Sequence, residues 1–421
     1  MKKNLFSITS GIILMFFGIT GLAQIPMFPE TVSMGPGYTN EVYYQFSTGN
    51  TTTTPRSTWD ISFRTMIMSS CILTNDGSGA TLWTYPYADT SGWAMVDTSG
   101  LSTWIPMYND PTDWENGAFN RNATGYPDYG WGKYNDVTHD LTGDSLFIIQ
   151  LCDGSFKKLW MVKKNSINKT FYFRYSNLDG SDFQEIVLNC NPYSDQDFVG
   201  FNLQTTLAVD YQPVKTSWDI LFTKYMSIQP NGEPYPVTGV LSNPVIITKK
   251  YYPVDPEYNN WEVAPWDSSR SNIGWDWKTF NMSTMTYQIN DSMVFYVQDT
   301  ATDVYRLKFT GFEGTATGNI DFGKAIVFPS WIGDQKQSNI RINVFPNPAT
   351  DFIQIDIEML KPLNEEVSIS LLDLTGRSIR TELLPSGQKQ INMNIQSLSP
   401  GVYLLMVISG NNLSLNQFIK Q

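Results

Sequence analysis

One stretch of the sequence occurs twice and decides the fold. It begins as Ser57-Thr58-Trp59-Asp60-Ile61-Ser62-Phe63 and returns as Thr216-Ser217-Trp218-Asp219-Ile220-Leu221-Phe222, 159 positions later (219 − 60). In the first occurrence apolar and polar residues alternate, which is typical of a β-strand with one buried face. We therefore expect the two Trp-Asp-Ile segments to be equivalent strands with the tryptophans buried.

Further matches follow the repeated stretch in the same order in both halves. They are Tyr129-Gly130-Trp131 with Ile273-Gly274-Trp275, Asp144–Gln150 with Asp291–Gln298, and Lys158-Leu159 with Arg306-Leu307. Matches that keep their order indicate an internal duplication. The second copy has the shorter loop after its Trp-Asp-Ile strand.

The remaining pattern predicts an all-β chain. Short runs rich in Val, Ile, Tyr, Phe and Trp alternate with turn-forming segments such as Asn75-Asp76-Gly77, and no stretch keeps a helical period of apolar residues over three turns. We expect two tandem related antiparallel β domains followed by a small C-terminal β-sandwich. The predicted boundaries are 1–23 for a signal peptide, 24–193 and 194–330 for the two copies, 331–339 for a linker and 340–421 for the tail.

The N-terminus has the three parts of a signal peptide. Met1-Lys2-Lys3-Asn4 precedes an apolar run from Leu5 to Ile19, and small residues at Gly21 and Ala23 fit a cleavage site before Gln24. The run is shorter than the ~20 residues that a membrane-spanning helix needs. We therefore expect export and no transmembrane segment in the mature chain.

Composition and charge narrow the possible partners. The chain has 421 residues, 16% of them charged and 14% aromatic, with a net charge of −12. A chain of this charge without a basic cluster repels phosphate backbones, so a nucleic-acid partner is not expected. Cys71, Cys152 and Cys190 form no CxxC pair, and no metal site is predicted. Export permits one disulfide; Cys152–Cys190 is weakly favoured and the pairing stays open.

The C-terminal segment carries three ordered motifs. They are Val344–Asp351, Leu372–Arg377 and Leu398–Leu405, with Lys420 near the end. This combination resembles the type IX secretion (Por-type) sorting domain. The resemblance implies that the secretion machinery and its sortase are partners, and that the protein reaches the cell surface or the medium via the periplasm. The motif residues are Pro346, Asn347, Pro348, Asp351, Asp373, Gly376, Arg377, Gly401 and Tyr403.

The body is similar, more loosely, to the HmuY-like family of secreted haem-binding β-proteins. The resemblance rests on Tyr44–Gly49, Thr58–Phe63, Val304–Phe309 and Gly318–Phe322. It implies haem as the ligand, held through axial side chains. Because this chain has one histidine, a pair of axial histidines is excluded within one molecule.

Candidate haem ligands are therefore few. They are His139, Met95 and Met107, with Trp104 and Tyr108 as residues that cover a porphyrin. Each candidate also has an ordinary structural interpretation, since His139 lies in a polar turn and methionine commonly fills cores.

Two catalytic interpretations are weaker than a binding function. Gly143-Asp144-Ser145-Leu146 matches an esterase motif, but no histidine follows Ser145 to act as its base. Acids stand beside tryptophans in Asp110–Glu115 and Asp255–Asp267, as in a sugar cleft or in solvated loops. We expect a non-catalytic binding protein with haem as the ligand by resemblance. The alternatives are a glycan-binding or adhesive surface protein and, less favoured, a glycoside hydrolase.

Overall fold

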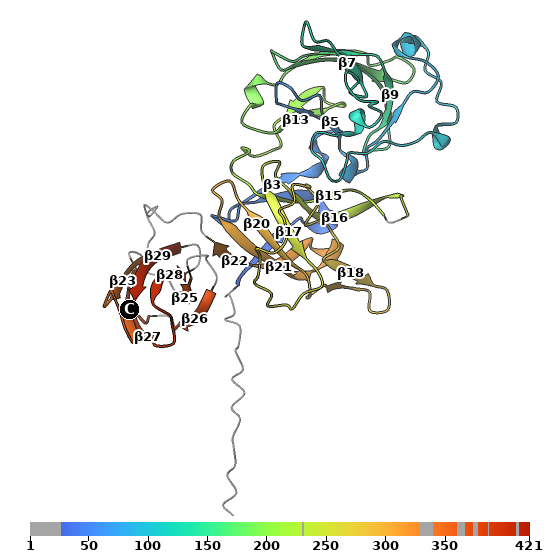
Figure 1. Ribbon diagram of the computed structural model, residues 1–421. Helices are drawn as coiled ribbons and strands as arrows, with labels where there is room; N and C mark the ends of the chain where they lie inside the picture. The colour runs from blue at the N-terminus through green and yellow to red at the C-terminus, as the bar shows by residue number, and fades with distance from the viewer. Residues whose placement is uncertain are drawn as a thin grey trace, which may run out of the picture. The chain divides into compact units, whose positions relative to one another are not determined.

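The computed structural model describes residues 27–229, 231–328, 340–359, 367–373, 378–385, 387–409 and 412–421. The chain divides into two compact units, a body within residues 26–338 and a tail within residues 339–421 (Figure 1). The expected signal peptide and linker lie outside the described residues and stay predictions.

The expectation of an all-β chain is confirmed. The described residues form antiparallel strands joined by turns and short 3-10 segments, without an α-helix. None of the described segments forms a helix with the length and apolar character that crossing a membrane requires.

The body consists of two lobes with eleven described strands each. The first lobe contains β4 (Ile61–Arg64), β5 (Ile72–Thr74), β6 (Thr81–Thr84), β7 (Gly132–Tyr134), β8 (Asp140–Gly143), β9 (Leu146–Gln150), β10 (Phe156–Asn165), β11 (Thr170–Asn177), β12 (Gln184–Asn189), β13 (Phe198–Asn202) and β14 (Leu207–Val209). The larger sheet has the strand order β12-β11-β10-β8-β7, and β9 also pairs with β10 and carries β6 on its other side. The smaller sheet has the order β14-β13-β4-β5.

The second lobe repeats this plan with segments from both ends of the body. It contains β1 (Phe28–Ser33), β2 (Asn40–Tyr44), β3 (Thr51–Pro55), β15 (Ile220–Ile228), β16 (Pro234–Ser242), β17 (Ile247–Tyr251), β18 (Lys278–Asn281), β19 (Thr286–Ile289), β20 (Val294–Gln298), β21 (Val304–Phe312) and β22 (Asn319–Phe328). Its sheets are β1-β22-β21-β20-β17, β16-β15-β2-β3 and the hairpin β18-β19.

The two sequence copies exchange their first three strands. Strand β2 pairs with β15, with Tyr44 opposite Ile220, while β13 pairs with β4, with Phe201 opposite Ile61. In the same way β1 pairs with β22 and β12 pairs with β11. Strands β1–β3 therefore complete the lobe built by the second half of the body, and β12–β14 complete the lobe built by the first half. The lobes differ in this respect from the expected copies 24–193 and 194–330.

The two Trp-Asp strands make the same contacts. The amide of Asp60 donates to the carbonyl of Phe201 (3.0 Å), and the amide of Asp219 donates to that of Tyr44 (2.8 Å). The carboxylate Oδ2 of Asp60 accepts from the Leu203 amide, and that of Asp219 from the Phe46 amide, both at 2.7 Å. Each aspartate thus ends the exchanged strand beside it.

The expected equivalence of Trp131 with Trp275 is wrong, and the true counterpart lies two positions later. Trp131 directly precedes β7 and is fully buried, and the residue in the same place before β18 is the fully buried Trp277. Trp275 is only half-buried and packs against the cluster between the lobes. The sequence match chose Trp275 because it follows a glycine, as Trp131 does, whereas Trp277 follows Asp276.

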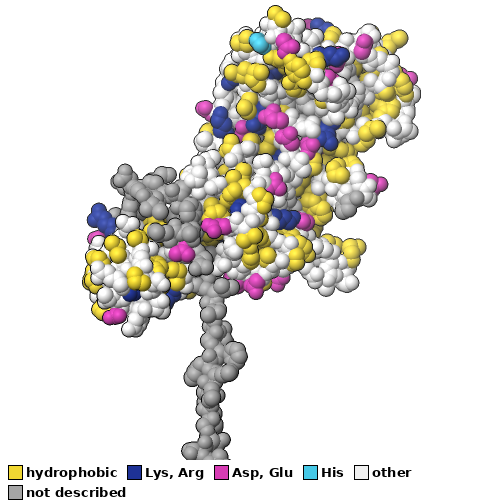
Figure 2. All heavy atoms as spheres, in the orientation of Figure 1, with side chains coloured by type: hydrophobic (Ala, Val, Ile, Leu, Met, Phe, Trp, Pro, Cys, Tyr) yellow, Lys and Arg dark blue, Asp and Glu magenta, His cyan; other side chains and the backbone are white. Residues whose placement is uncertain are grey.

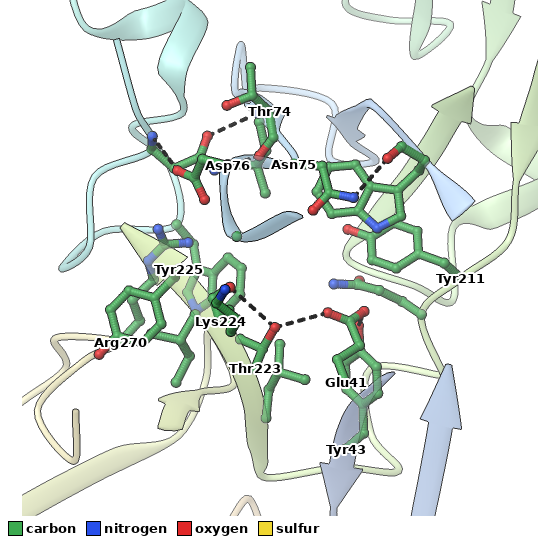
Figure 3. Close-up of a pocket in the computed structure, with 18 residues that line it drawn as sticks. Glu41, Tyr43, Thr74, Asn75, Asp76, Tyr211, Thr223, Lys224, Tyr225 and Arg270 are labelled. Atoms are coloured by element: carbon green, nitrogen blue, oxygen red, sulfur yellow. Dashed lines mark hydrogen bonds between the residues drawn. The ribbon is translucent and has the colours of Figure 1, made fainter. Parts of the chain in front are cut away.

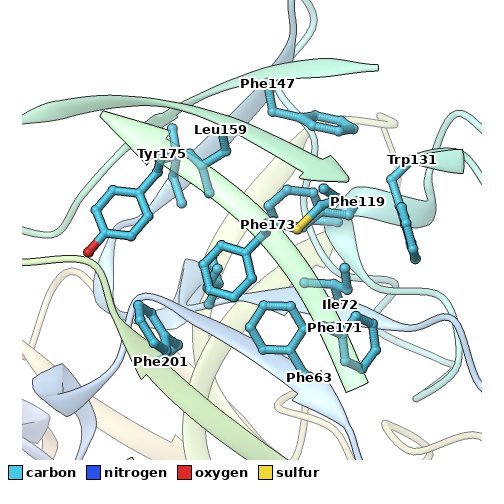
Figure 4. Close-up of a cluster of buried hydrophobic side chains, with 14 of the residues drawn as sticks. Phe63, Ile72, Phe119, Trp131, Phe147, Leu159, Phe171, Phe173, Tyr175 and Phe201 are labelled. Atoms are coloured by element: carbon cyan, nitrogen blue, oxygen red, sulfur yellow. The ribbon is translucent and has the colours of Figure 1, made fainter. Parts of the chain in front are cut away.

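Three apolar clusters hold the body together. One fills the first lobe, where Phe63 packs on Phe171 (4.8 Å between ring centroids) and Phe173 (5.2 Å) (Figure 4). A second fills the other lobe, and a third joins the two and contains Trp59 and Trp218. Burial of this apolar area is the main stabilising contribution to the fold.

The tail is a β-sandwich, as expected. Its described strands are β23 (Ile340–Phe345), β24 (Phe352–Met359), β25 (Val367–Leu372), β26 (Ser378–Leu384), β27 (Gln390–Asn394), β28 (Gly401–Ser409) and β29 (Asn412–Lys420). Sheets β23-β24-β27 and β26-β25-β28-β29 contribute to one core, in which Ile355 and Leu405 are fully buried.

The weakly favoured disulfide is wrong for this structure. Cys71 and Cys190 are buried, Cys152 is exposed, and all three are free. Cys152 lies in the turn after β9, whereas Cys190 belongs to the core of the first lobe.

Candidate functional site

The sorting motif forms a junction between β23 and the last strand of the tail. The side chain of Asn347 donates to the carbonyl of Gln417 (3.1 Å) and accepts from the amide of Ile419 (2.9 Å). The amide of the buried Ala349 also donates to the Ile419 carbonyl (2.8 Å). The exposed Pro346 and Pro348 flank Asn347 and have no amide hydrogen to donate.

The other motif residues support turns and strand ends. Tyr403 stacks on Phe418 (5.8 Å) and donates to the carbonyl of Ser399 (2.9 Å). Gly401 begins β28, the carbonyl of Asp351 accepts from the Ile395 amide (2.9 Å), and Asp373 follows β25. Gly376 and Arg377 lie outside the described residues.

A polar cavity of about 50 Å³ lies where the lobes meet (Figure 3). Strands of both lobes and the 3-10 turn η3 (Asp76–Ser78) line it. Its charged residues are Glu41, Asp76, Lys224 and Arg270. The exchange of strands creates this arrangement, because Glu41 on β2 reaches the cavity only by pairing with β15 of the other half.

The two acids of the cavity are buried in different ways. The Glu41 carboxylate accepts hydrogen bonds from Tyr43 (2.8 Å), Thr54 (3.3 Å) and Thr223 (3.3 Å), yet burial raises its pKa above the usual range. Asp76 accepts from the amide of Asn109 (3.0 Å). Burial raises the pKa of Asp76 to about 7, against the lowering effect of Arg270.

Several donors around the cavity have no partner. Arg270 is 4% exposed, its guanidinium lies over the ring of Trp114 (4.4 Å), and its Nε makes no hydrogen bond. The indole nitrogen of Trp59, the hydroxyl of Thr74 and the phenol of Tyr225 are likewise buried and unpartnered within the described part of the chain. Such groups are uncommon in folded proteins and usually meet water, an ion or a ligand.

An aromatic loop, residues 85–106, covers the outer face of the first lobe's larger sheet. Tyr85, Tyr87 and Trp104 pack edge to face, with ring centroids 5.6 to 5.9 Å apart. Tyr87 is 58% exposed, and Met95 and Ile105 on the same loop are 85% and 84% exposed. Figure 2 shows hydrophobic side chains at the edge of the lobe where Figure 1 draws this part of the chain in cyan.

The loop is fastened to the sheet by a buried lysine. Lys158 on β10 donates to the carbonyl of Trp93 (2.9 Å) and lies under its ring (5.0 Å). Trp93 also contacts Trp160 (6.5 Å) and Phe183 (6.1 Å), which extends the aromatic surface onto the sheet.

The second lobe has an equivalent loop with a different surface. Arg306, the counterpart of Lys158, donates to the carbonyls of Tyr258 (3.2 Å) and Pro256 (2.6 Å). Lys249 lies against the half-buried rings of Trp261 (5.2 Å) and Trp266 (4.4 Å). Both lobes therefore place a cation against the tryptophans of this loop.

The structure places the three candidate haem ligands in different environments. Met107 is a core residue of the first lobe, 5% exposed, and its amide donates to Leu82. Met95 is exposed on the aromatic loop. His139 is exposed in the turn between β7 and β8, with its Nδ1 2.7 Å from the hydroxyl of Tyr134. No hydrogen bond or ring contact between these three is present in the described ranges, and their role stays a prediction.

The residues considered for glycosidase or esterase activity form hydrogen bonds and ion pairs with neighbouring side chains. Asp110 accepts from Thr112 (2.7 Å) and pairs with Arg121 (2.5 Å). Glu115 pairs with the buried Arg64 (3.1 Å). The hydroxyl of Ser145 donates to the adjacent Asp144 (2.9 Å).

Sequence reasoning missed the residues of the cavity. Glu41 follows the ordinary polar alternation of a strand, and Arg270 comes directly after Asp267-Ser268-Ser269, a run typical of solvated loops. Only the repeat could have pointed there, because each Trp-Asp strand must meet a partner strand.

Comparison with known proteins identifies the tail. Residues 343–421 match the secretion system C-terminal sorting domain. This tail is a type IX secretion (Por) sorting domain, and the protein is exported by the type IX secretion system to the cell surface or the medium. None of the curated proteins matches the chain.

Two solved structures show distant similarity. The extracellular domain of a one component system from B. thetaiotaomicron is 12% identical, with a TM-score of 0.17 over 82% of this chain. Dimeric latent PorU from Porphyromonas gingivalis is 11% identical, with a TM-score of 0.17 over 67% of this chain. The match spans 58% of the first of those chains and 31% of the second.

Proposed function

We propose that the protein is a non-catalytic binding protein of the cell surface or medium, whose aromatic loop binds glycan. The observation that carries the proposal is the edge-to-face pair of the exposed Tyr87 and the half-buried Trp104 (5.7 Å) on a loop fastened to the sheet. Aromatic rings offer flat apolar area at a small cost in side-chain entropy, which suits the apolar faces of sugar rings.

The rim of the loop supplies polar groups beside these rings. The carboxylate of Asp97 accepts from the amide of Ser99 (2.8 Å), and the hydroxyl of Tyr87 donates to the Ser99 carbonyl (2.9 Å). An aromatic surface with few fixed polar groups favours an extended polymer over a ligand that needs a deep pocket.

The absence of catalysis is part of the proposal. Glu41 and Asp76 have the raised pKa values that general acids often have, so the cavity between the lobes is the place where hydrolysis would be sought. Its volume of about 50 Å³ is far below the roughly 300–1,000 Å³ of pockets that hold small ligands. A sugar ring therefore has no room between these carboxyls.

Glycan binding is tested with soluble xylan, mannan and starch in affinity electrophoresis of the full chain. We expect retardation by at least one polymer, and its loss in Tyr87→Ala and Trp104→Ala. Tyr235→Ala is the matched control, because Tyr235 is also 58% exposed but lies on β16 of the second lobe. Equal retardation of all variants would reject the aromatic loop as the site.

Haem is the second candidate, favoured by the exposed thioether of Met95 on the same loop. Thioether sulfur is a known axial ligand of haem iron. Titration with ferric and ferrous haem should then shift the Soret band, and Met95→Ala should remove the shift, with His139→Ala and Met107→Ala as comparisons. An unchanged spectrum in both redox states rejects haem and leaves the glycan proposal untouched.

A further inference from the structure

The cavity between the lobes has the features of an anion site. We infer that it binds one small anion, coordinated by Arg270 and by the unpartnered donors around it. The inference is independent of the aromatic loop. It rests on the position of Arg270, on the kind of groups without partners and on the volume of the cavity.

Arg270 is held rigidly at the cavity wall. Its backbone amide donates to the carbonyl of Thr112 (3.0 Å), and its carbonyl accepts from the amide of Ser242 (2.7 Å). Its guanidinium lies on the Trp114 ring, and the Trp114 indole is fixed by donating to the Ser242 carbonyl (2.8 Å). The charged group is thus placed before any ligand arrives.

The guanidinium lacks a close counterion. Within the described ranges, Arg270 forms no ion pair with an acid inside 4.0 Å, and its Nε donates to nothing. A buried cation without a partner is unfavourable, because burial removes its hydration. Among the acids, Asp76 has the largest electrostatic effect on the pKa of Arg270, but it does not form an ion pair with the guanidinium.

The other unpartnered groups also require acceptor atoms. The indole nitrogen of Trp59 and the Nε of Arg270 can only donate, and the hydroxyls of Thr74 and Tyr225 are able to donate. A guest beside any of these groups must therefore present lone pairs. A halide, nitrate or small carboxylate does so, and its charge also compensates Arg270.

The volume fits a small guest. A water molecule needs about 10–15 Å³ measured in this way, so about 50 Å³ accommodates a small anion or a few waters. Water is the competing occupant, because it can also accept from these donors. The experiment must therefore separate the two.

The charge of the cavity depends on pH. Besides Asp76, the titratable groups that line it are Glu41, Tyr43, Tyr211, Lys224, Tyr225 and Arg270. Burial raises the pKa of Asp76 to about 7, so protonation of Asp76 below pH 7 removes negative charge facing the anion. Burial also raises the pKa of Glu41 above its usual range. Anion binding should therefore be tighter at pH 6 than at pH 8.

Bromide is the probe, because its anomalous scattering distinguishes it from water. A crystal of the full chain soaked in sodium bromide should show an anomalous peak in the cavity, and calorimetric titration should show saturable binding that weakens from pH 6 to pH 8. Arg270→Gln should abolish the binding, while Arg174→Gln, which removes a partly exposed arginine paired with Glu185 on the first lobe's larger sheet, should leave it unchanged.

Tyr225→Phe provides a second variant in case Arg270→Gln fails to fold. It removes one unpartnered hydroxyl and should weaken bromide binding several-fold. The inference is overturned if the cavity contains only ordered water, if bromide appears only at crystal concentration without saturable binding in solution, or if Arg270→Gln binds as the wild type does.

Discussion

Trp218 and Trp59 show how single residues connect the two copies. Trp218 is 2% exposed and meets Tyr43 edge to face (5.1 Å), while Trp59 stacks on Tyr211 (4.8 Å). Each tryptophan thus packs on a strand or connector that belongs to the other copy. Both pairs belong to the one buried cluster that joins the lobes.

Truncation of a shared tryptophan should destabilise the whole body. We expect Trp218→Ala to lower the free energy of unfolding by roughly 3–5 kcal/mol, the usual cost of deleting a large buried aromatic side chain. Urea denaturation followed by fluorescence measures it. Trp275→Ala, which removes a half-buried ring, should cost clearly less; equal costs would contradict the shared core.

Asp219 predicts a pH dependence of stability. Burial raises its pKa to about 7, so the folded state holds this proton more tightly than the unfolded chain. Its contribution is fully present at acidic pH and is lost as pH rises from about 4 towards 7. Asp219→Asn keeps an oxygen that accepts from the Phe46 amide and should remove this slope. A slope unchanged in the variant would assign the effect to other groups.

The sequence predicts residue roles unevenly. The Trp-Asp pairs were recognisable because two copies preserve them in matching strand patterns, and their burial is confirmed. The residues of the cavity were not recognisable from the sequence. Glu41, Asp76 and Arg270 are separated by up to 229 positions (270 − 41) and carry no shared motif. Their proximity results from strand pairing that no local pattern encodes.

At the scale of elements, each large sheet is covered by a loop attached through one cation. Lys158 in the first lobe and Arg306 in the second come from matching positions of β10 and β21, and both donate to backbone carbonyls of the loop. The repeat indicated these positions as equivalent. The sequence did not reveal the loop contacts, because backbone carbonyls leave no trace in side-chain patterns.

Lys158→Met should loosen the aromatic loop. The substitution keeps an apolar stem over the sheet and removes the donor to the Trp93 carbonyl, so amides of residues 90–104 should exchange hydrogen faster. Lys163→Met on the same strand is the control, because Lys163 is 42% exposed and pairs with Asp140. Equal exchange in both variants would show that ring packing alone holds the loop.

At the scale of the molecule, the exchange of strands predicts that the two copies cannot be separated by one cut. A protease site inserted between Gly180 and Ser181, in the turn before β12, divides the copies but leaves β2–β15 and β13–β4 paired. The cleaved body should elute as one species without denaturant and as two in urea. Two species under native conditions would contradict the exchange.

The sorting tail predicts where a truncated protein stays. Deletion of residues 340–421 removes the segment that matches the sorting domain, so the body should accumulate in the periplasm of the native host. Fractionation with immunodetection measures this. Equal amounts of full-length and truncated protein outside the cell would show that another part of the chain directs export.

The antiparallel pairing of β1 with β22 has a kinetic consequence. Phe28 lies opposite Lys324, 296 positions away (324 − 28), whereas the strands of the first lobe all lie between residues 61 and 209. Contacts between residues far apart in sequence form late, because closing a long loop has a high entropic cost. Strands β1 and β2 must therefore wait for β22 and β15 from the far end of the body, and the second lobe should be the last to close.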